Sequence, residues 1–393
     1  MMKKISVILG SISDKEVMAN AFEILERFGI PYEKRVISAH RALDHLCEYA
    51  KGLDEEGVGA IIAAAGGAAA LPGVIAAMTV IPVIGVPIKS KSLSGRDSLL
   101  SIVQMPAGVA DRGLDIAQCA YKGINIAYLS KTGVVSPVYY QQFNNGFFDN
   151  FYGGLLTTCG LTQTGSPCYE GEEFLPQHGD YHNIPAQDLS ITQEWDGEEY
   201  VIELRGVVRE ARFFGKNLRL VRSIKTKYLA RTIEITDKIE NLGYNDEPLM
   251  LLYHFNIGWP ILDKNAVFTK SESETIARDA EAEEDPPTYD KIYAPSLNFK
   301  EKVFIHRGFK TDWAYGQIYN PDIAGGLGVR VSFKPEQLPY LTQWKQFGFG
   351  EYVLGIEPST NYPLGRVRER EAGRLRTLKP GEIKLVELKI EIV

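Results

Sequence analysis

The chain has 393 residues, a formal net charge of −7 and four cysteines. This length is enough for two domains with cores of their own. No basic cluster interrupts the acidic balance, which argues against a nucleic-acid partner. Because the cysteines have neither the spacing of a disulfide framework nor that of a metal site, we expect free thiols in a reducing compartment, the cytoplasm.

An uncharged run spans residues 57–88 and could be mistaken for a membrane span. Three prolines, Pro72, Pro82 and Pro87, interrupt it, and alanine stands where leucine would be expected. Two buried parallel strands with a short helix between them explain the run better, since such strands are apolar on both faces. The apolar run at the N-terminus ends at Gly10, too soon for a signal peptide. We therefore expect no contact with a membrane.

Four short apolar runs predict parallel strands in the first 90 residues: Ile5–Leu9, Arg35–Ile37, Ala60–Ala65 and Pro82–Ile88. Helical patterns at Glu16–Phe28 and Leu43–Leu53 follow the first two runs. In a parallel sheet, the loops that lead from strands to helices meet at one edge. We therefore expect one crevice to collect the polar side chains of the first two loops, namely Ser11, Ser13, Asp14, Ser38, His40 and Arg41.

This set of side chains has the chemistry of an active site. Small loop residues leave backbone N–H groups free to approach an anion. Arg41 offers a bidentate donor for a phosphate or a carboxylate. His40 is the group in the crevice that can move a proton near neutral pH.

Four motifs then occur in order: GSISD from Gly10, SAHR from Ser38, GGAAALPG from Gly66 and DSLLSIVQMP from Asp97. With them, residues 4 to about 109 resemble the carboxyaminoimidazole ribonucleotide mutase / phosphoribosylaminoimidazole carboxylase family of purine synthesis. The resemblance implies a flavodoxin-like, three-layer parallel sheet. It also implies a ribonucleotide bound by Ser11, Asp14 and Arg41, with proton transfer by His40. The further substrate-binding residues that we assign are Ser13, Ser38, Gly67, Ala68 and Leu71.

The sequence departs from this family at three places. Family members usually carry a histidine at the position of Ala70 and an aromatic residue at that of Lys15. After Val109 the last strand and the C-terminal helices of the family should begin, but the sequence changes character. We therefore expect a truncated sheet in a first domain that spans residues 1–109.

Alternating strand patterns replace the helical patterns after about residue 120. We interpret the acidic stretch Glu272–Asp285 as a solvated loop or a helical excursion. A large antiparallel β domain, a sandwich or a barrel, is expected over residues 110–393. Its predicted strands are Glu199–Val207, Leu218–Thr226, Thr232–Lys238, Met250–Phe255, Gly328–Phe333, Tyr352–Ile356 and Ile383–Ile392.

Three residues of this domain could carry chemistry: His178 in a loop, and His254 and Glu357 at the ends of strands. Two histidines and a carboxylate are the minimum set for opening and closing a sugar hemiacetal. One group takes the proton of the anomeric hydroxyl while another protonates the ring oxygen. We expect Glu357 and His254 within one sugar's width, on opposite sides of the sugar, with His178 at the rim.

Five landmarks, DRGLDI, GGLLTTCG, LMLLYHFNIGWPILD, LTQWK and GEYVLGIEP, give residues 111–393 a resemblance to the galactose mutarotase superfamily. The closer likeness is to its uncharacterised aldose-epimerase-like branch. It implies a mutarotase-type β-sandwich with Glu357 as general base, His254 as general acid and His178 hydrogen-bonded to the substrate. Trp344 could line the pocket with an aromatic face, and Lys345 could offer a cation to an acidic group. Strands that normally precede DRGLDI are missing.

Other interpretations of these residues stay open. His254 could be a core histidine, and Trp344 could simply pack in the core or at the rim. His178 and His182 share an H-x-x-x-H spacing, but in a proline-flanked loop, so we expect no metal. No cofactor is expected either. His45 is expected at the surface, and His306 receives no assignment.

Three functions remain possible. The first is an isomerase or lyase acting on an aminoimidazole ribonucleotide, and the second is a sugar epimerase or mutarotase. The third is a non-catalytic carbohydrate-binding domain carried on an oligomerising α/β segment. The expected partners are small-molecule substrates. Because the missing helices would leave apolar sheet surface uncovered, we also expect a homo-oligomer.

Overall fold

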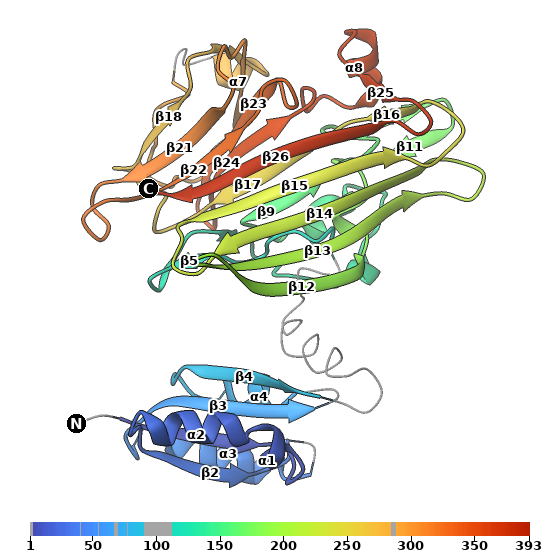
Figure 1. Ribbon diagram of the computed structural model, residues 1–393. Helices are drawn as coiled ribbons and strands as arrows, with labels where there is room; N and C mark the ends of the chain where they lie inside the picture. The colour runs from blue at the N-terminus through green and yellow to red at the C-terminus, as the bar shows by residue number, and fades with distance from the viewer. Residues whose placement is uncertain are drawn as a thin grey trace. The chain divides into compact units, whose positions relative to one another are not determined.

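A computed structural model describes residues 3–39, 41–53, 55–66, 70–76, 78–89, 112–283 and 288–393. The chain divides into two compact units, Met1–Gly108 and Val109–Val393. The boundary expected between residues 109 and 110 lies outside the described residues. The two units have different architectures, the first built on a parallel sheet and the second on antiparallel sheets (Figure 1).

The first unit contains a parallel sheet in the order β2-β1-β3-β4. Side chains of β1 alternate between its two faces, so Ile8 packs in the cluster with Leu46 and Ile75, while Val7 packs in the cluster with Phe22. Helices therefore cover both faces, which confirms the three-layer fold. The strands are β1 (Lys4–Leu9), β2 (Tyr32–Val36), β3 (Val58–Gly66) and β4 (Val83–Ile88), and the helices are α1 (Asp14–Val17), α2 (Ala19–Arg27), α3 (Leu43–Gly52) and α4 (Leu71–Ala76).

Two details of this unit differ from the sequence expectation. The helix expected at Glu16–Phe28 is divided at Met18 into α1 and α2. The second strand ends at Val36, and Ile37 is buried just beyond it. At the β4 edge, Ile84 is half exposed although it pairs with Ile62 inside the sheet. This edge carries apolar surface that the described residues do not cover.

The second unit is a β-sandwich. Residues of its two large sheets share one core cluster, which contains Leu220 and Leu388 from the larger sheet and Phe255 and Ile356 from the smaller. The sandwich expected from the alternating strands is therefore confirmed. In spatial order the larger sheet contains β12 (Gln187–Asp196), β13 (Glu199–Ala211), β14 (Asn217–Lys227), β15 (Thr232–Asn241), β26 (Ile383–Ile392), β22 (Leu327–Phe333), β21 (Ala314–Asn320) and β18 (Val267–Lys270).

The smaller sheet has six strands and carries the candidate site. In spatial order it contains β19 (Glu274–Ala277), β20 (Lys302–Arg307), β23 (Tyr340–Gly348), β24 (Glu351–Ser359), β17 (Leu252–Ile257) and β9 (Leu156–Cys159).

The remaining described elements of the second unit are short. The strands among them form two-stranded sheets and are β5 (Ala120–Tyr121), β6 (Ile124–Asn125), β7 (Tyr128–Leu129), β8 (Gly153–Gly154), β10 (Cys168–Glu170), β11 (Glu173–Leu175), β16 (Glu247–Leu249) and β25 (Arg376–Leu378). The helices are α6 (Gly146–Asn150), α7 (Ala280–Glu283) and α8 (Arg366–Glu371), and the 3-10 turns are η2 (Pro137–Tyr139) and η3 (Tyr181–Asn183).

The acidic stretch Glu272–Asp285 contains a strand and a short helix among its described residues. The strand β19 differs from the expectation of a solvated loop or a helical excursion, whereas the helix α7 agrees with a helical excursion. The four cysteines are free thiols, as expected. Among the helices that the structure describes, none is long and apolar enough to cross a membrane.

A buried ion cluster centres on Arg222 of β14. Its guanidinium contacts Asp115 Oδ1 at 2.7 Å and Asp237 Oδ2 at 2.6 Å, and all three side chains are fully buried. Arg222 also donates to Thr158 Oγ1, and the hydroxyl of Tyr253 donates to Asp237. The cluster therefore joins the segment around Asp115 to β9, β14, β15 and β17. Burial raises the pKa of Asp115 to about 6, although the positive charge of Arg222 acts to lower it.

Replacing Arg222 should strongly destabilise the sandwich. Arg222→Met leaves two buried carboxylates without their cation, so we expect a loss of about 3–5 kcal/mol in the free energy of unfolding. Tryptophan fluorescence during urea denaturation reports this domain selectively, because all four tryptophans lie after residue 111. Arg205→Met is the matched control on β13, where an exposed arginine pairs with Glu203 and should cost under about 1 kcal/mol. Equal losses for the two variants would contradict the role of the cluster.

Candidate functional site

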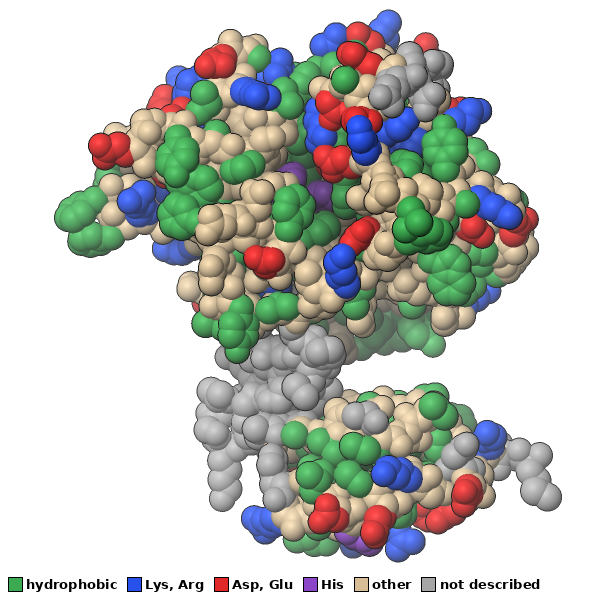
Figure 2. Space-filling view, turned by 180° about the vertical axis from the view of Figure 1, so that it is seen from behind, with side chains coloured by type: hydrophobic (Ala, Val, Ile, Leu, Met, Phe, Trp, Pro, Cys, Tyr) green, Lys and Arg blue, Asp and Glu red, His purple; other side chains and the backbone are tan. Residues whose placement is uncertain are grey.

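A cavity of about 490 Å³ opens on the face of the smaller sheet that points away from the core. In β17, Tyr253 and Phe255 point into the core, so His254 between them points into the cavity. In β24, Ile356 points into the core and Glu357 into the cavity. Figure 2 shows histidine side chains in a hollow of this domain.

His254 and Glu357 meet at the floor of this cavity. β17 pairs with β24, and Phe255 lies opposite Ile356, which places the two candidate side chains on neighbouring strands. Their Nε2 and Oε1 atoms are 3.3 Å apart, and both side chains are almost completely buried. A Cβ atom on Gly355 would lie 2.2 Å from Glu357 Oε1. The glycine therefore leaves the space that the carboxyl group occupies.

Aromatic rings surround the pair. The Trp344 ring packs edge-on against His254 at 5.3 Å between centroids, and Phe151 lies 5.3 Å from the same histidine. The indole N–H of Trp344 donates to Glu301 Oε2 at 2.8 Å. Arg278 donates to the other oxygen of Glu301, also at 2.8 Å. These contacts hold the indole beside the pair.

His178 belongs to the wall of the cavity. It lies in the loop before η3 with a positive φ of 60°, and only 9% of its surface is exposed. The Gly165 N–H donates weakly to its Nδ1 at 3.4 Å. Its ring centroid is 5.8 Å from that of His254 and 5.0 Å from that of Phe147. The expectation of a histidine at the rim is therefore wrong, because the loop folds inward.

Burial sets the protonation of these groups. It raises the pKa of Glu357 well above the ordinary 4.5 and lowers the pKa of His254 well below the ordinary 6.5. It also lowers the pKa of His178 to about 4. A buried pair in contact titrates as a unit. When the pair holds one proton, the raised pKa of Glu357 and the lowered pKa of His254 place that proton on the carboxyl group, so that both groups are neutral.

Three expectations for this site need correction. His254 and Glu357 lie inside their strands rather than at strand ends. They touch each other, so they cannot flank a sugar from opposite sides. Lys345 does not line the cavity, because consecutive residues of β23 point to opposite faces. It is buried with its Nζ donating to the Thr288 carbonyl, whereas Trp344 faces the cavity as expected.

Sequence reasoning missed Arg278, Glu301 and Phe151 in this site. Arg278 lies within the acidic stretch that we interpret as a solvated loop or a helical excursion, and Glu301 lies between strands without any motif around it. Phe151 closes an aromatic run, Phe147-Phe148 and Phe151, whose density was a usable signal.

The other described histidines, His306, His182 and His45, do not line this cavity. His306 contacts Thr275 Oγ1 and Gln343 Oε1 inside the sandwich. His182 is fully buried against the rings of Phe147 and Tyr140. His45 is exposed on α3, as expected. Within the described ranges, no group of three or more His, Cys, Asp or Glu side chains could hold a metal ion.

In the first unit, the structure describes part of the expected crevice. Asp14 is buried at the start of α1, and its Oδ2 accepts the Ser11 N–H at 2.9 Å. The hydroxyl of Ser13 donates to that of Ser11 at 2.9 Å. Asp14 therefore holds the first loop closed over the strand end, while both serines are exposed.

The second and third loops are described only in part. Ser38 is half-buried and accepts the Arg41 N–H at 3.3 Å, and the Arg41 residue is exposed. The Leu71 side chain is buried in the core cluster, so the expectation that it contacts substrate is wrong for the side chain. His40, Gly67 and Ala68 lie outside the described residues.

Two family models match the chain, in ranges that overlap at residues 105–134. Residues 105–392 match the model of a family described as "Domain of unknown function (DUF4432)", and residues 4–134 match AIR carboxylase. N5-carboxyaminoimidazole ribonucleotide mutase of Pyrococcus abyssi (strain GE5 / Orsay) is 60% identical over 121 residues, which is 30% of this chain and 70% of that protein. The chain joins an AIR carboxylase segment to a DUF4432 domain.

Two further proteins are each similar to one part of this chain. The same mutase from Bacillus subtilis (strain 168) is 58% identical over 105 residues, 27% of this chain and 65% of that protein. A crystal structure of an aldose 1-epimerase candidate from Klebsiella pneumoniae subsp. pneumoniae MGH 78578 has a TM-score of 0.68 and 25% identity. That match covers 72% of this chain and 75% of the other. The AIR carboxylase segment thus belongs to an enzyme family, and the DUF4432 domain has the mutarotase-like fold.

The protonation of the DUF4432 site can be measured directly. We expect the ring signals of His254 in histidine-labelled protein to titrate well below pH 6.5, because burial disfavours the imidazolium. The same shift makes the folded domain less stable as the pH falls below 6.5, since the unfolded chain then binds more protons. NMR titration of the wild type, with His254→Gln to assign the signal, checks the first point. A midpoint at or above 6.5 would contradict the burial of the site.

Proposed function

We propose that the DUF4432 domain interconverts the anomers of an aldose by opening and closing the sugar ring. The contact between His254 and Glu357 at the floor of an aromatic-walled cavity carries this proposal. The anomeric hydroxyl and the ring oxygen of an aldose are bonded to the same carbon. Two acid–base groups in contact can therefore reach both oxygens from one side of the sugar.

The reaction needs only proton transfers. One member of the pair takes the proton of the anomeric hydroxyl while the other gives a proton to the ring oxygen, and the bond between the anomeric carbon and the ring oxygen breaks. Rotation of the aldehyde and the reverse transfers close the ring to the other anomer. Glu357 is the proposed base and His254 the proposed acid. Since burial favours the resting proton on Glu357, the proton must first pass to His254 within the pair.

The cavity suits a neutral sugar. Its cations already face carboxylates, with Lys131 paired to Glu351 and Arg278 to Glu301. An acidic sugar would have to displace one of these pairs. Trp344 and Phe151 offer ring faces to the C–H groups of a sugar, and His178, which lines the same cavity, can contact a hydroxyl. The cation that Lys345 was expected to supply points elsewhere.

We propose a second activity for the AIR carboxylase segment, the binding and carboxyl transfer of an aminoimidazole ribonucleotide. The identity of about 60% to mutases and the loop held by Asp14 and Ser11 support it. Arg41 is the proposed phosphate ligand and His40 the proposed proton carrier. Assembly into a homo-oligomer stays a prediction, supported by the half-exposed apolar edge at Ile84.

Polarimetry of freshly dissolved aldoses tests the first proposal. Glu357→Gln removes a proton-transfer group, so we expect the catalysed rate to fall by a factor of about 100 or more. Glu371→Gln, an exposed glutamate at the end of α8, is the matched control and should keep the wild-type rate. Equal rates for wild type and Glu357→Gln across neutral and acidic aldoses would exclude mutarotation. The carbohydrate-binding module would then be the remaining function of the domain.

Calorimetry with carboxyaminoimidazole ribonucleotide tests the second proposal. His40→Asn should abolish turnover and keep measurable binding, because the proton carrier is lost but the phosphate contacts are not. Arg41→Ala should weaken binding by about 10- to 100-fold, the loss of hydrogen bonds to a charged group. Arg27→Ala, at the end of α2, is the control and should bind as the wild type does. Absence of ribonucleotide binding by the wild type would refute the proposal.

A further inference from the structure

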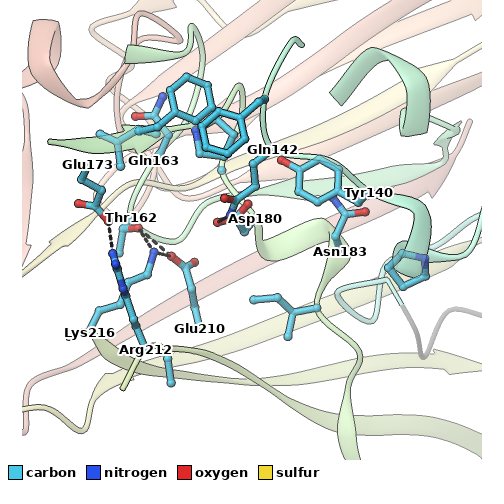
Figure 3. Close-up of a pocket in the computed structure, with 18 of the residues that line it drawn as sticks. Tyr140, Gln142, Thr162, Gln163, Glu173, Asp180, Asn183, Glu210, Arg212 and Lys216 are labelled. Carbon is cyan, nitrogen blue, oxygen red and sulfur yellow. Dashed lines mark hydrogen bonds and ion pairs between the residues drawn. The ribbon is translucent and has the colours of Figure 1, made fainter. Parts of the chain in front are cut away.

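A second cavity, of about 710 Å³, lies in the DUF4432 domain apart from the sugar site. None of His254, Glu357 and Trp344 lines it. Its volume is in the range of small-molecule sites, roughly 300–1,000 Å³. Figure 3 shows Tyr140 and Asn183 on one side of this space and Glu173 and Lys216 on the other, with Asp180 between them.

Polar groups of its wall lack partners. Neither atom of the Asn183 side-chain amide has a hydrogen-bond partner in the part of the chain that the structure describes, although both are buried. Asp180 Oδ2 accepts the Gln142 amide, but Asp180 Oδ1 and the Tyr140 hydroxyl have no well-aligned hydrogen bond among the described residues, although Asp180 lies close enough to raise the pKa of Tyr140. Buried amides and carboxyl groups without partners are costly, and native proteins usually satisfy them. A polar molecule in the cavity would supply the missing partners.

The charge of the wall favours a neutral molecule over an anion. Lys216 Nζ contacts Glu210 Oε1 at 2.5 Å and donates to Thr162 Oγ1 at 2.9 Å. Arg212 faces Glu173 at 3.8 Å. The lining as a whole contains four carboxylates and three cations. A phosphate or a sulfate would therefore have to compete with carboxylates already in place.

An aromatic surface completes the lining. The rings of Phe143 and Phe174 stack at 4.9 Å between centroids, and Tyr169 packs against Phe174 at 5.1 Å. All three residues line the cavity. Apolar ring faces beside amide and carboxyl groups match a molecule that has C–H faces and several hydroxyls.

We propose that this cavity binds a neutral polyhydroxylated small molecule, a sugar or an alditol, at a site separate from the His254–Glu357 pair. Asn183 and Asp180 contact its hydroxyls, and Tyr140 donates or accepts a further hydrogen bond. The wall segment from Leu175 to Asn183 serves both sites, because it gives His178 to the sugar site and Asp180 and Asn183 to this one.

Alditols test this site, because they have no anomeric centre and cannot be turned over. Saturation-transfer NMR and calorimetry of the full chain with D-glucitol and D-galactitol should detect saturable binding of at least one of them. Asn183→Leu should weaken that binding about tenfold or more. Tyr140→Phe, which removes one hydroxyl and is mild enough to preserve the fold, should weaken it about three- to tenfold. Tyr139→Phe is the matched control, since Tyr139 is 73% exposed and should bind as the wild type does.

Sugar-site variants separate the two cavities. Trp344→Ala and Glu357→Gln should keep alditol binding, so failure of mutarotation leaves this proposal standing. Three results would overturn it: no saturable binding of either alditol, loss of binding in Trp344→Ala with retention in both Asn183→Leu and Tyr140→Phe, or binding of inorganic phosphate in place of the alditols.

Discussion

The buried guanidinium of Arg222 is the interaction on which the DUF4432 domain depends. One cation contacts two carboxylates, Asp115 and Asp237, where no water can screen them. Charges in such a place are tolerated only with complete partners, so the backbone around them has little freedom. Because the Tyr253 hydroxyl donates to Asp237, the residue before His254 is bound to this cluster. The position of His254, a candidate site residue, follows from a contact on the opposite face of its strand.

Strand alternation then decides which side chains can act together. On β17, β23 and β24 alternate residues pack in the core, and the side chains that line the cavity, among them His254, Trp344 and Glu357, stand at the positions between them. Trp344 and Lys345 are neighbours in sequence, yet one faces the cavity and the other is buried behind it. Proximity in a motif therefore does not establish membership in a site. The register of the strand has to be known as well.

Much of the fold could be predicted because its signals are local. The alternation in Ile383–Ile392 predicts β26 at its observed bounds, and the apolar runs predict the parallel sheet. Glu357, His254 and His178 could be named as candidates because each stands in a recognisable motif. Arg278 and Glu301 could not, since their place in the site comes from pairings between distant strands. The inward fold of the His178 loop likewise depends on its contacts with Gly165 and Phe147, which no local pattern records.

The ion cluster also limits how far this domain can be shortened from its N-terminal side. Asp115, a partner of Arg222, stands within the first few described residues of the sandwich. A version of this domain that began after Asp115 would keep Arg222 and Asp237 but lack one of the two carboxylates that surround the guanidinium. The buried cation would then have incomplete partners, so the segment around Asp115 is as necessary to the sandwich as its long strands are.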